Sequence, residues 1–117
     1  AMTDVTGFGL YGHLTGMCEA SNVGAELNFD AVPLMLGAAE LAAQGVRSSL
    51  FDDNHAIAPW VQTTGAQDLL FDPQTAGGLL AAVSADEAEE MVQALHQAGE
   101  AAAVIGSVTQ GSGIVIA

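Results

Sequence analysis

The stretch GLYGHLTGMCEASNVGAELNF, residues 9–29, contains two hydrophobic periods in succession and decides the fold class. In its first part the apolar side chains recur three and four residues apart, which is the spacing of one helix face. These side chains are Leu10, Leu14, Met17 and Cys18. Asn22 or Gly24 is expected to end the helix. From residue 25 to residue 30 apolar and polar residues alternate, which predicts a half-buried strand directly after the helix.

Outward from this stretch, helices and strands continue to alternate. The expected elements are a helix over 35–44 that ends at Gly45, a strand over 79–83, a helix that opens with the Ser84 and Glu87 capping pattern and ends at Gly99, and strands over 101–108 and 113–117. The helix after Ser84 is expected to bury a stripe of Ala88, Met91, Val92 and Leu95. Residues 47–66 give mixed signals and are expected to form a loop with one short element. The pattern predicts one α+β domain over residues 1–117, with helices packed on a mixed β-sheet.

The charge of the chain excludes several kinds of partner. Lys plus Arg is 1 against 14 Asp plus Glu, which gives a formal net charge of −13, and the one cation is Arg47. Nucleic acid and anionic membrane surfaces both require clustered cations, so neither is expected as a partner. No apolar run approaches the roughly 18 residues that cross a bilayer, and the single cysteine permits no intrachain disulfide. A cytoplasmic protein is the prediction.

Two loops are richer in glycine and polar residues than folding requires. They are TDVTGFG, residues 3–9, and DPQTAGG, residues 72–78, and each holds an aspartate, a threonine and two glycines. Aspartate is a suitable oxygen ligand for Mg²⁺, and glycine lets the backbone approach a bulky ligand. Both loops also have a structural interpretation, because Asp72-Pro73 is a common turn former and Thr6 a common helix N-cap.

The remaining reactive side chains are expected to be structural. His13 lies near the apolar stripe of its helix and is expected to be packed and hydrogen-bonded. His55 and His96 are too far apart in sequence and pattern to suggest a zinc site. Cys18 belongs to the apolar stripe and has no basic residue near it in sequence, so it is expected to be an inert core thiol.

TDVTGFGLYGHLTGMCEA, residues 3–20, and LLFDPQTAGGLL, residues 69–80, closely resemble the C-terminal half of the selenide, water dikinase family, the selenophosphate synthetases. The intervening GAELNFDAVPL fits as well, so the resemblance covers nearly the whole chain. The family belongs to the superfamily of aminoimidazole ribonucleotide synthetase. Tyr11 stands where the family usually has leucine, and Ala76 where serine is usual.

The resemblance implies an ATP- and Mg²⁺-dependent enzyme that converts selenide, ATP and water to selenophosphate, AMP and orthophosphate. It implies Asp4 as a metal ligand in a loop that meets the nucleotide. The expected nucleotide contacts are Thr3, Thr6, Gly7 and Gly9, and the residues of a secondary loop are Asp72, Gln74, Thr75, Gly77 and Gly78.

The family's nucleophilic cysteine or selenocysteine, its catalytic lysine and its glycine-rich segment belong to an N-terminal half that this chain lacks. The resemblance therefore implies a C-terminal domain that works with that N-terminal domain, in a homodimer, and is inactive alone. Two alternatives are another ATP-using member of the superfamily, such as the purine-pathway synthetase or a hydrogenase maturation factor, and a non-catalytic acidic docking module. The sequences of both loops argue against the purine-pathway synthetase and the hydrogenase maturation factor, whereas the docking module stays an open alternative.

Overall fold

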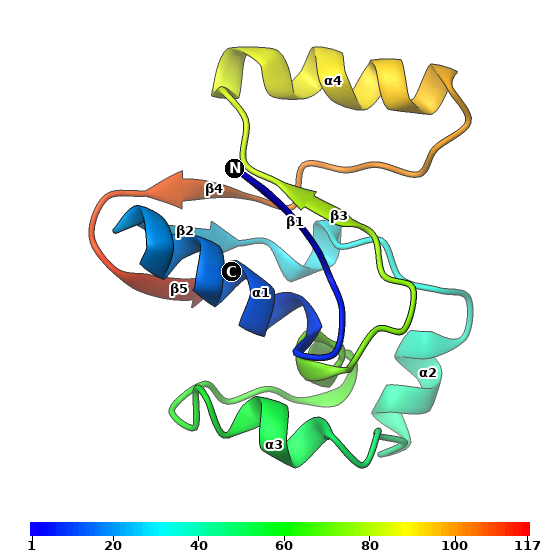
Figure 1. Ribbon diagram of the computed structural model, residues 1–117. Coiled ribbons are helices and arrows are strands. Elements are labelled where there is room, and N and C mark those ends of the chain that lie inside the picture. The colour runs from blue at the N-terminus through cyan, green and yellow to red at the C-terminus, as the bar shows by residue number, and fades with distance from the viewer. The chain divides into compact units, whose positions relative to one another are not determined.

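The computed structural model describes residues 1–117 as two compact units. One unit comprises Ala1, Cys18–Pro33 and Ala81–Ala117, and the other comprises Met2–Met17 and Leu34–Leu80. The elements, labelled in Figure 1, are β1 (Met2–Asp4), α1 (Gly9–Ser21), β2 (Gly24–Leu27), the 3-10 helix η1 (Phe29–Ala31), α2 (Ala38–Ala43), α3 (Phe51–His55), the 3-10 helix η2 (Gly65–Phe71), β3 (Leu79–Ala81), α4 (Ala85–Gln97), β4 (Gly106–Thr109) and β5 (Gly113–Ile116). Helices together with a mixed sheet confirm the predicted α+β class.

The three-stranded sheet of the first unit has the order β4-β2-β5 (Figure 1). β2 pairs antiparallel with β4 and parallel with β5. The two last strands are joined by a short turn over residues 110–112, yet they do not pair with each other, because β2 lies between them. β4 begins only at Gly106, so residues 101–105 lie outside the strand that was expected over 101–108.

Glycines allow the short connection to pass around the start of β2. A Cβ on Gly24 would lie 2.8 Å from the carbonyl oxygen of Gly113 and 2.9 Å from Oγ1 of Thr109. Gly111 and Gly113 have φ angles of 100° and 87°, in the left-handed region that favours glycine. A side chain at Gly24 would therefore collide with the connection that places β4 and β5 on either side of β2.

The alternation predicted for residues 25–30 is confirmed in burial. Ala25, Leu27 and Phe29 are buried, and the polar residues between them are exposed. The strand itself ends at Leu27. The side chain of Asn28 accepts a hydrogen bond from Asp30 N at 3.2 Å and opens η1, so a local side-chain contact replaces strand pairing there.

α1 ends where it was expected to end. Asn22 follows its last residue with a φ of 54°, the left-handed conformation of a helix C-terminus. The buried positions of the helix are Tyr11 and Cys18, seven residues apart, whereas Leu10, Leu14 and Met17 are only half-buried. The buried line is therefore displaced from the predicted stripe towards Tyr11. The centre of the Tyr11 ring lies 4.9 Å from the centre of the Phe71 ring.

α4 follows Ser84 and ends before Gly99, which has a φ of 86°. The expected burial of its apolar stripe is wrong: no residue of α4 is buried, and the Met91 and Leu95 residues are 45% and 39% exposed. Apolar spacing is enough to form an amphipathic helix, but burial also needs a facing surface.

In the second unit, α2 and α3 both contact η2, whose Leu70 and Phe71 are fully buried. α2 begins three residues later than expected, because Gly37 before it has a φ of 84°, and it is followed by Gly45 with a φ of 85°. The short element expected within residues 47–66 is α3. None of the helices combines the length and the apolar character that crossing a lipid bilayer requires.

Candidate functional site

The two glycine-rich loops lie against each other in the second unit. We call residues 3–9 the first loop and residues 72–78 the second loop. Gln74 N in the second loop donates to the carbonyl oxygen of Thr6 at 3.0 Å, and Val5 N in the first loop donates to that of Gly78 at 2.9 Å. Two motifs about seventy residues apart in sequence therefore form one site.

Close backbone approach explains two of the four loop glycines. A Cβ on Gly77 would overlap the carbonyl oxygen of Val5. A Cβ on Gly9 would lie 2.8 Å from the carbonyl oxygen of Leu70, and the φ of Gly9 is +73°. Nothing lies within 4 Å of a Cβ built on Gly7 or Gly78, so these two glycines are not required by contacts within the chain.

Thr6 is held by His13 of α1. Thr6 N donates to His13 Nε2 at 3.0 Å, and Thr6 Oγ1 lies 3.1 Å from the same nitrogen. Because a backbone N–H can only donate, Nε2 is the acceptor and the ring proton belongs on Nδ1. The expectation of a hydrogen-bonded His13 is confirmed. α1 begins only at Gly9, and the Thr6 hydroxyl contacts the His13 ring and accepts from no backbone N–H of the helix, so the N-cap interpretation of Thr6 is wrong.

Asp4 ends β1 with an exposed carboxylate. That carboxylate accepts no hydrogen bond and forms no ion pair. The neighbouring Thr3 hydroxyl donates to the backbone oxygen of Asp4 at 3.2 Å. Asp4 therefore caps no helix and closes no turn through its side chain, and its oxygens are available to a cation.

The carboxylate of Asp72, in the second loop, has a hydrogen-bond partner, unlike that of Asp4. Gln74 Nε2 donates to Asp72 Oδ2 at 3.1 Å and to the Asp72 carbonyl oxygen at 3.3 Å. Asp72 also follows η2, with its N donating to Leu69 O at 3.2 Å. Burial raises the pKa of the Asp72 carboxyl, and the Gln74 hydrogen bond opposes that rise. Thr75, next in the loop, is exposed.

Asn54 of α3 connects the first loop to Phe71, the residue directly before the second loop, and was not found from the sequence. Its Nδ2 donates to the carbonyl oxygen of Gly7 at 2.8 Å and to that of Phe71 at 2.9 Å. Asn54 is 7% exposed and is one of two buried polar residues, the other being Asp68. The only sequence signal was a polar residue within a short, mixed segment.

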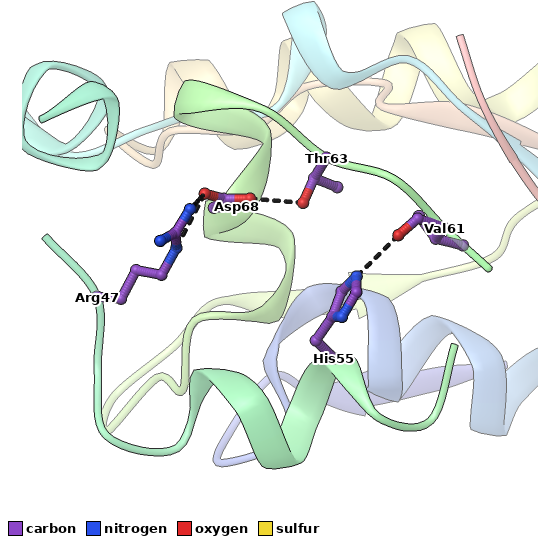
Figure 2. Close-up of polar contacts among 5 residues, drawn as sticks. All are labelled: Arg47, His55, Val61, Thr63 and Asp68. Carbon is purple, nitrogen blue, oxygen red and sulfur yellow. Dashed lines mark hydrogen bonds and ion pairs between the residues drawn. The ribbon is translucent and has the colours of Figure 1, made fainter. Parts of the chain in front are cut away.

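The single arginine serves the fold. Figure 2 shows Asp68 between Arg47 and Thr63: Arg47 forms an ion pair with Asp68, and Thr63 Oγ1 donates to Asp68 Oδ1 at 2.5 Å. The guanidinium carbon of Arg47 also lies 4.8 Å from the centre of the Phe51 ring. Since this cation is paired with a buried carboxylate, positive charge for a phosphate ligand has to come from elsewhere.

The other two histidines make their own local contacts. His55 Nε2 donates to Val61 O at 2.7 Å, as Figure 2 shows, and the His55 ring stacks on Phe51. His96 Nε2 donates to Ala102 O at 2.7 Å. Nowhere do three or more His, Cys, Asp or Glu side chains gather into a group that could hold a metal ion. A metal at Asp4 would have to take its other ligands from water, from a substrate or from outside this chain.

Cys18 lies on the buried line of α1 and is 6% exposed. Burial raises the pKa of its thiol, and the negative charge of Glu19 raises it further. A buried thiol of raised pKa carries little thiolate, so the expectation of a core cysteine is confirmed and a nucleophilic role is disfavoured.

Curated proteins named selenide, water dikinase are similar to the chain along most of its length. The protein from Clostridioides difficile is 40% identical over 115 residues, which are 92% of this chain and 33% of the relative. The protein from Photobacterium profundum is 44% identical over 99 residues, which are 81% of this chain and 29% of the relative. The protein from Carboxydothermus hydrogenoformans is 40% identical over an alignment of 122 residues, which covers 99% of this chain and 35% of the relative.

The chain thus spans about a third of the length of the curated relatives that it matches. These similarities confirm the resemblance to selenide, water dikinases that the two loop motifs indicated. The family described as AIR synthase related protein, C-terminal domain, matches residues 1–117. The chain therefore belongs to the AIR synthase related protein C-terminal domain family.

Proposed function

We propose that this chain is the C-terminal domain of a selenide, water dikinase. The longer enzyme converts ATP, selenide and water to selenophosphate, AMP and orthophosphate. The relatives named selenide, water dikinase, which the chain matches over 81% to 99% of its length, support this proposal. The chain acts in the cytoplasm together with the N-terminal domain of the same enzyme, in a homodimer, and alone it forms no selenophosphate.

The observation that carries the proposal is the contrast between the Asp4 side chain and the loop around it. The backbone of the first loop is hydrogen-bonded at Val5, Thr6 and Gly7, whereas the Asp4 carboxylate is exposed and has no partner. An anionic ligand on a fixed backbone suits Mg²⁺, which takes one or two protein carboxylates and completes its shell with water and phosphate oxygens. We assign Asp4 as a magnesium ligand of the nucleotide site.

The charge of the chain supports the same assignment. The chain carries one arginine, which is bound to Asp68, and a formal net charge of −13. Such a domain repels a triphosphate, so its contribution to a nucleotide site is to hold the cation. Asp4 would hold Mg²⁺ at this site, and the ion would supply the positive charge that phosphoryl transfer requires. Thr3, Thr6, Gly7 and Gly9 shape the loop that presents Asp4 to the nucleotide.

Asp4→Asn in the full-length enzyme tests this function. The substitution removes a negative ligand and keeps the shape of the side chain, so selenophosphate formation, followed by ³¹P NMR with ATP and selenide, should fall at least about a hundredfold. The free energy of unfolding should stay within about 1 kcal/mol of the wild-type value, because the Asp4 carboxylate has no partner to lose.

Asp30→Asn is the matched control, because Asp30 is also an exposed aspartate but lies in η1 of the other unit. We expect it to keep both activity and stability. Near-normal turnover of the Asp4→Asn enzyme at ordinary Mg²⁺ concentrations would refute the ligand assignment.

A further inference from the structure

Asn54 uses both N–H groups of its side-chain amide to hold two carbonyl groups. The amide nitrogen carries two hydrogens and lies 2.8 Å from the oxygen of Gly7 and 2.9 Å from that of Phe71. Each acceptor takes one hydrogen, so both donors are used. Gly7 belongs to the first loop, and Phe71 is the residue directly before the second loop. The Asn54 side chain therefore links the two loops from the side of α3.

Gly7 has little else to hold it. It has no side chain, and a Cβ built at this position would meet nothing within 4 Å, so packing does not restrain it. Gly7 lies inside the four-residue turn from Thr6 to Gly9, which the hydrogen bond from Gly9 N to Thr6 O closes at 3.1 Å. Without Asn54, that backbone bond alone would hold this point of the first loop.

The position of Gly7 affects how firmly the Asp4 carboxylate is placed. Only Val5 and Thr6 separate Asp4 from Gly7, and a glycine has more backbone freedom than any other residue. The affinity of a site for a metal depends on how well surrounding hydrogen bonds fix its ligands. We infer that Asn54 is a positioning residue, which fixes the first loop at Gly7 so that the Asp4 carboxylate is already placed for a divalent cation. This inference rests on the proposed function of Asp4.

Asn54→Asp in the full-length enzyme is the test, because it keeps the size of the side chain and replaces the nitrogen that carries both donor hydrogens with an acceptor oxygen. Asn54→Ala is the second variant, since it removes the donors without adding charge. Asn28→Asp is the control: Asn28 acts through its oxygen, which accepts from Asp30 N, and aspartate keeps that acceptor. Thermal unfolding shows which variants are folded.

Two measurements report separately on the rigidity of the first loop and on its affinity for the metal. Hydrogen–deuterium exchange of the amides of residues 5–9, without metal, reports how firmly the loop is held. Electron paramagnetic resonance with Mn²⁺, a spin probe for the Mg²⁺ site, gives the dissociation constant. We expect both Asn54 variants to exchange faster in residues 5–9 and to bind Mn²⁺ about tenfold more weakly or worse, the scale of loss typical when outer-shell support of a metal site is removed. Asn28→Asp should behave as the wild-type enzyme does.

The outcomes distinguish this inference from the function on which it rests. If the Asn54 variants bind Mn²⁺ as tightly as the wild type while Asp4→Asn binds it weakly, the positioning role is overturned and the function of Asp4 stands. If neither Asn54 variant folds, Asn54 is a residue of the core alone and the inference also fails. If Asp4→Asn itself keeps full Mn²⁺ affinity, the ligand assignment falls and takes the positioning role with it, whatever the exchange data give.

Discussion

The first and second loops have nearly the same ingredients and use their aspartates in different ways. Asp4 is exposed and has no partner, whereas Asp72 is half-buried and accepts a hydrogen bond from Gln74 at 3.1 Å. The glycines divide similarly, because Gly77 allows close contact with Val5 while Gly78 beside it faces open space. Composition marks a loop as unusual, but the bonding of each group decides whether it holds the loop or remains available to a ligand.

The largest effect on the contact between the loops is expected from Gly77→Ala. The new Cβ would overlap the carbonyl oxygen of Val5, which is backbone and cannot rotate away. Forcing extra atoms into a tight contact usually costs about 1–3 kcal/mol, so the free energy of unfolding should fall by about that amount in urea titrations.

Gly78→Ala is the adjacent control for this substitution. A Cβ at Gly78 meets nothing within 4 Å, so the change should be close to neutral. Equal losses of stability in the two variants would show that the close approach of Gly77 and Val5 does not hold the loops together.

A smaller, pH-dependent effect is expected from Asp72→Asn. The folded-state pKa of Asp72 lies above its ordinary value of 3.8, so folding disfavours the ionised carboxylate. This residue's contribution to stability is therefore fully present below pH 3.8 and is lost as the pH rises through the raised pKa. Asparagine stays neutral and still offers an oxygen to Gln74.

Thermal unfolding from pH 3 to pH 7 checks this expectation. The stability of Asp72→Asn relative to the wild type should increase with pH, by about 0.5 kcal/mol or less, as is usual for partly exposed sites. A relative stability that decreases with rising pH would mean that ionised Asp72 stabilises the fold, contrary to the direction of its pKa shift.

Local patterns were enough to predict several elements. Three-and-four spacing located α1 and α4, alternation located the buried residues of β2, and glycine or asparagine correctly marked the ends of both helices. The α+β class follows from such patterns. These features depend on residues within a few positions of one another, and for that reason they can be inferred from one sequence.

Other features depend on contacts between distant residues. Residues 110–112 look like a hairpin turn, but β2 takes the place between β4 and β5, and no local signal records that. At the site, Asn54 acts on a residue 47 positions away, and in the fold around it Arg47 acts on one 21 positions away. The stripe of α4 was located correctly and its burial was not, because burial needs a second surface.

Binding of Mn²⁺ to the full-length enzyme tests most directly whether the two aspartates have different roles. The dissociation constant, from electron paramagnetic resonance, should rise at least about tenfold in Asp4→Asn, which loses a charged ligand. In Asp72→Asn it should stay within about twofold of the wild-type value, because Asp72 is bound to Gln74 within its own loop. Unchanged binding in Asp4→Asn, or an equal loss in Asp72→Asn, would contradict the assignment of the metal to the first loop.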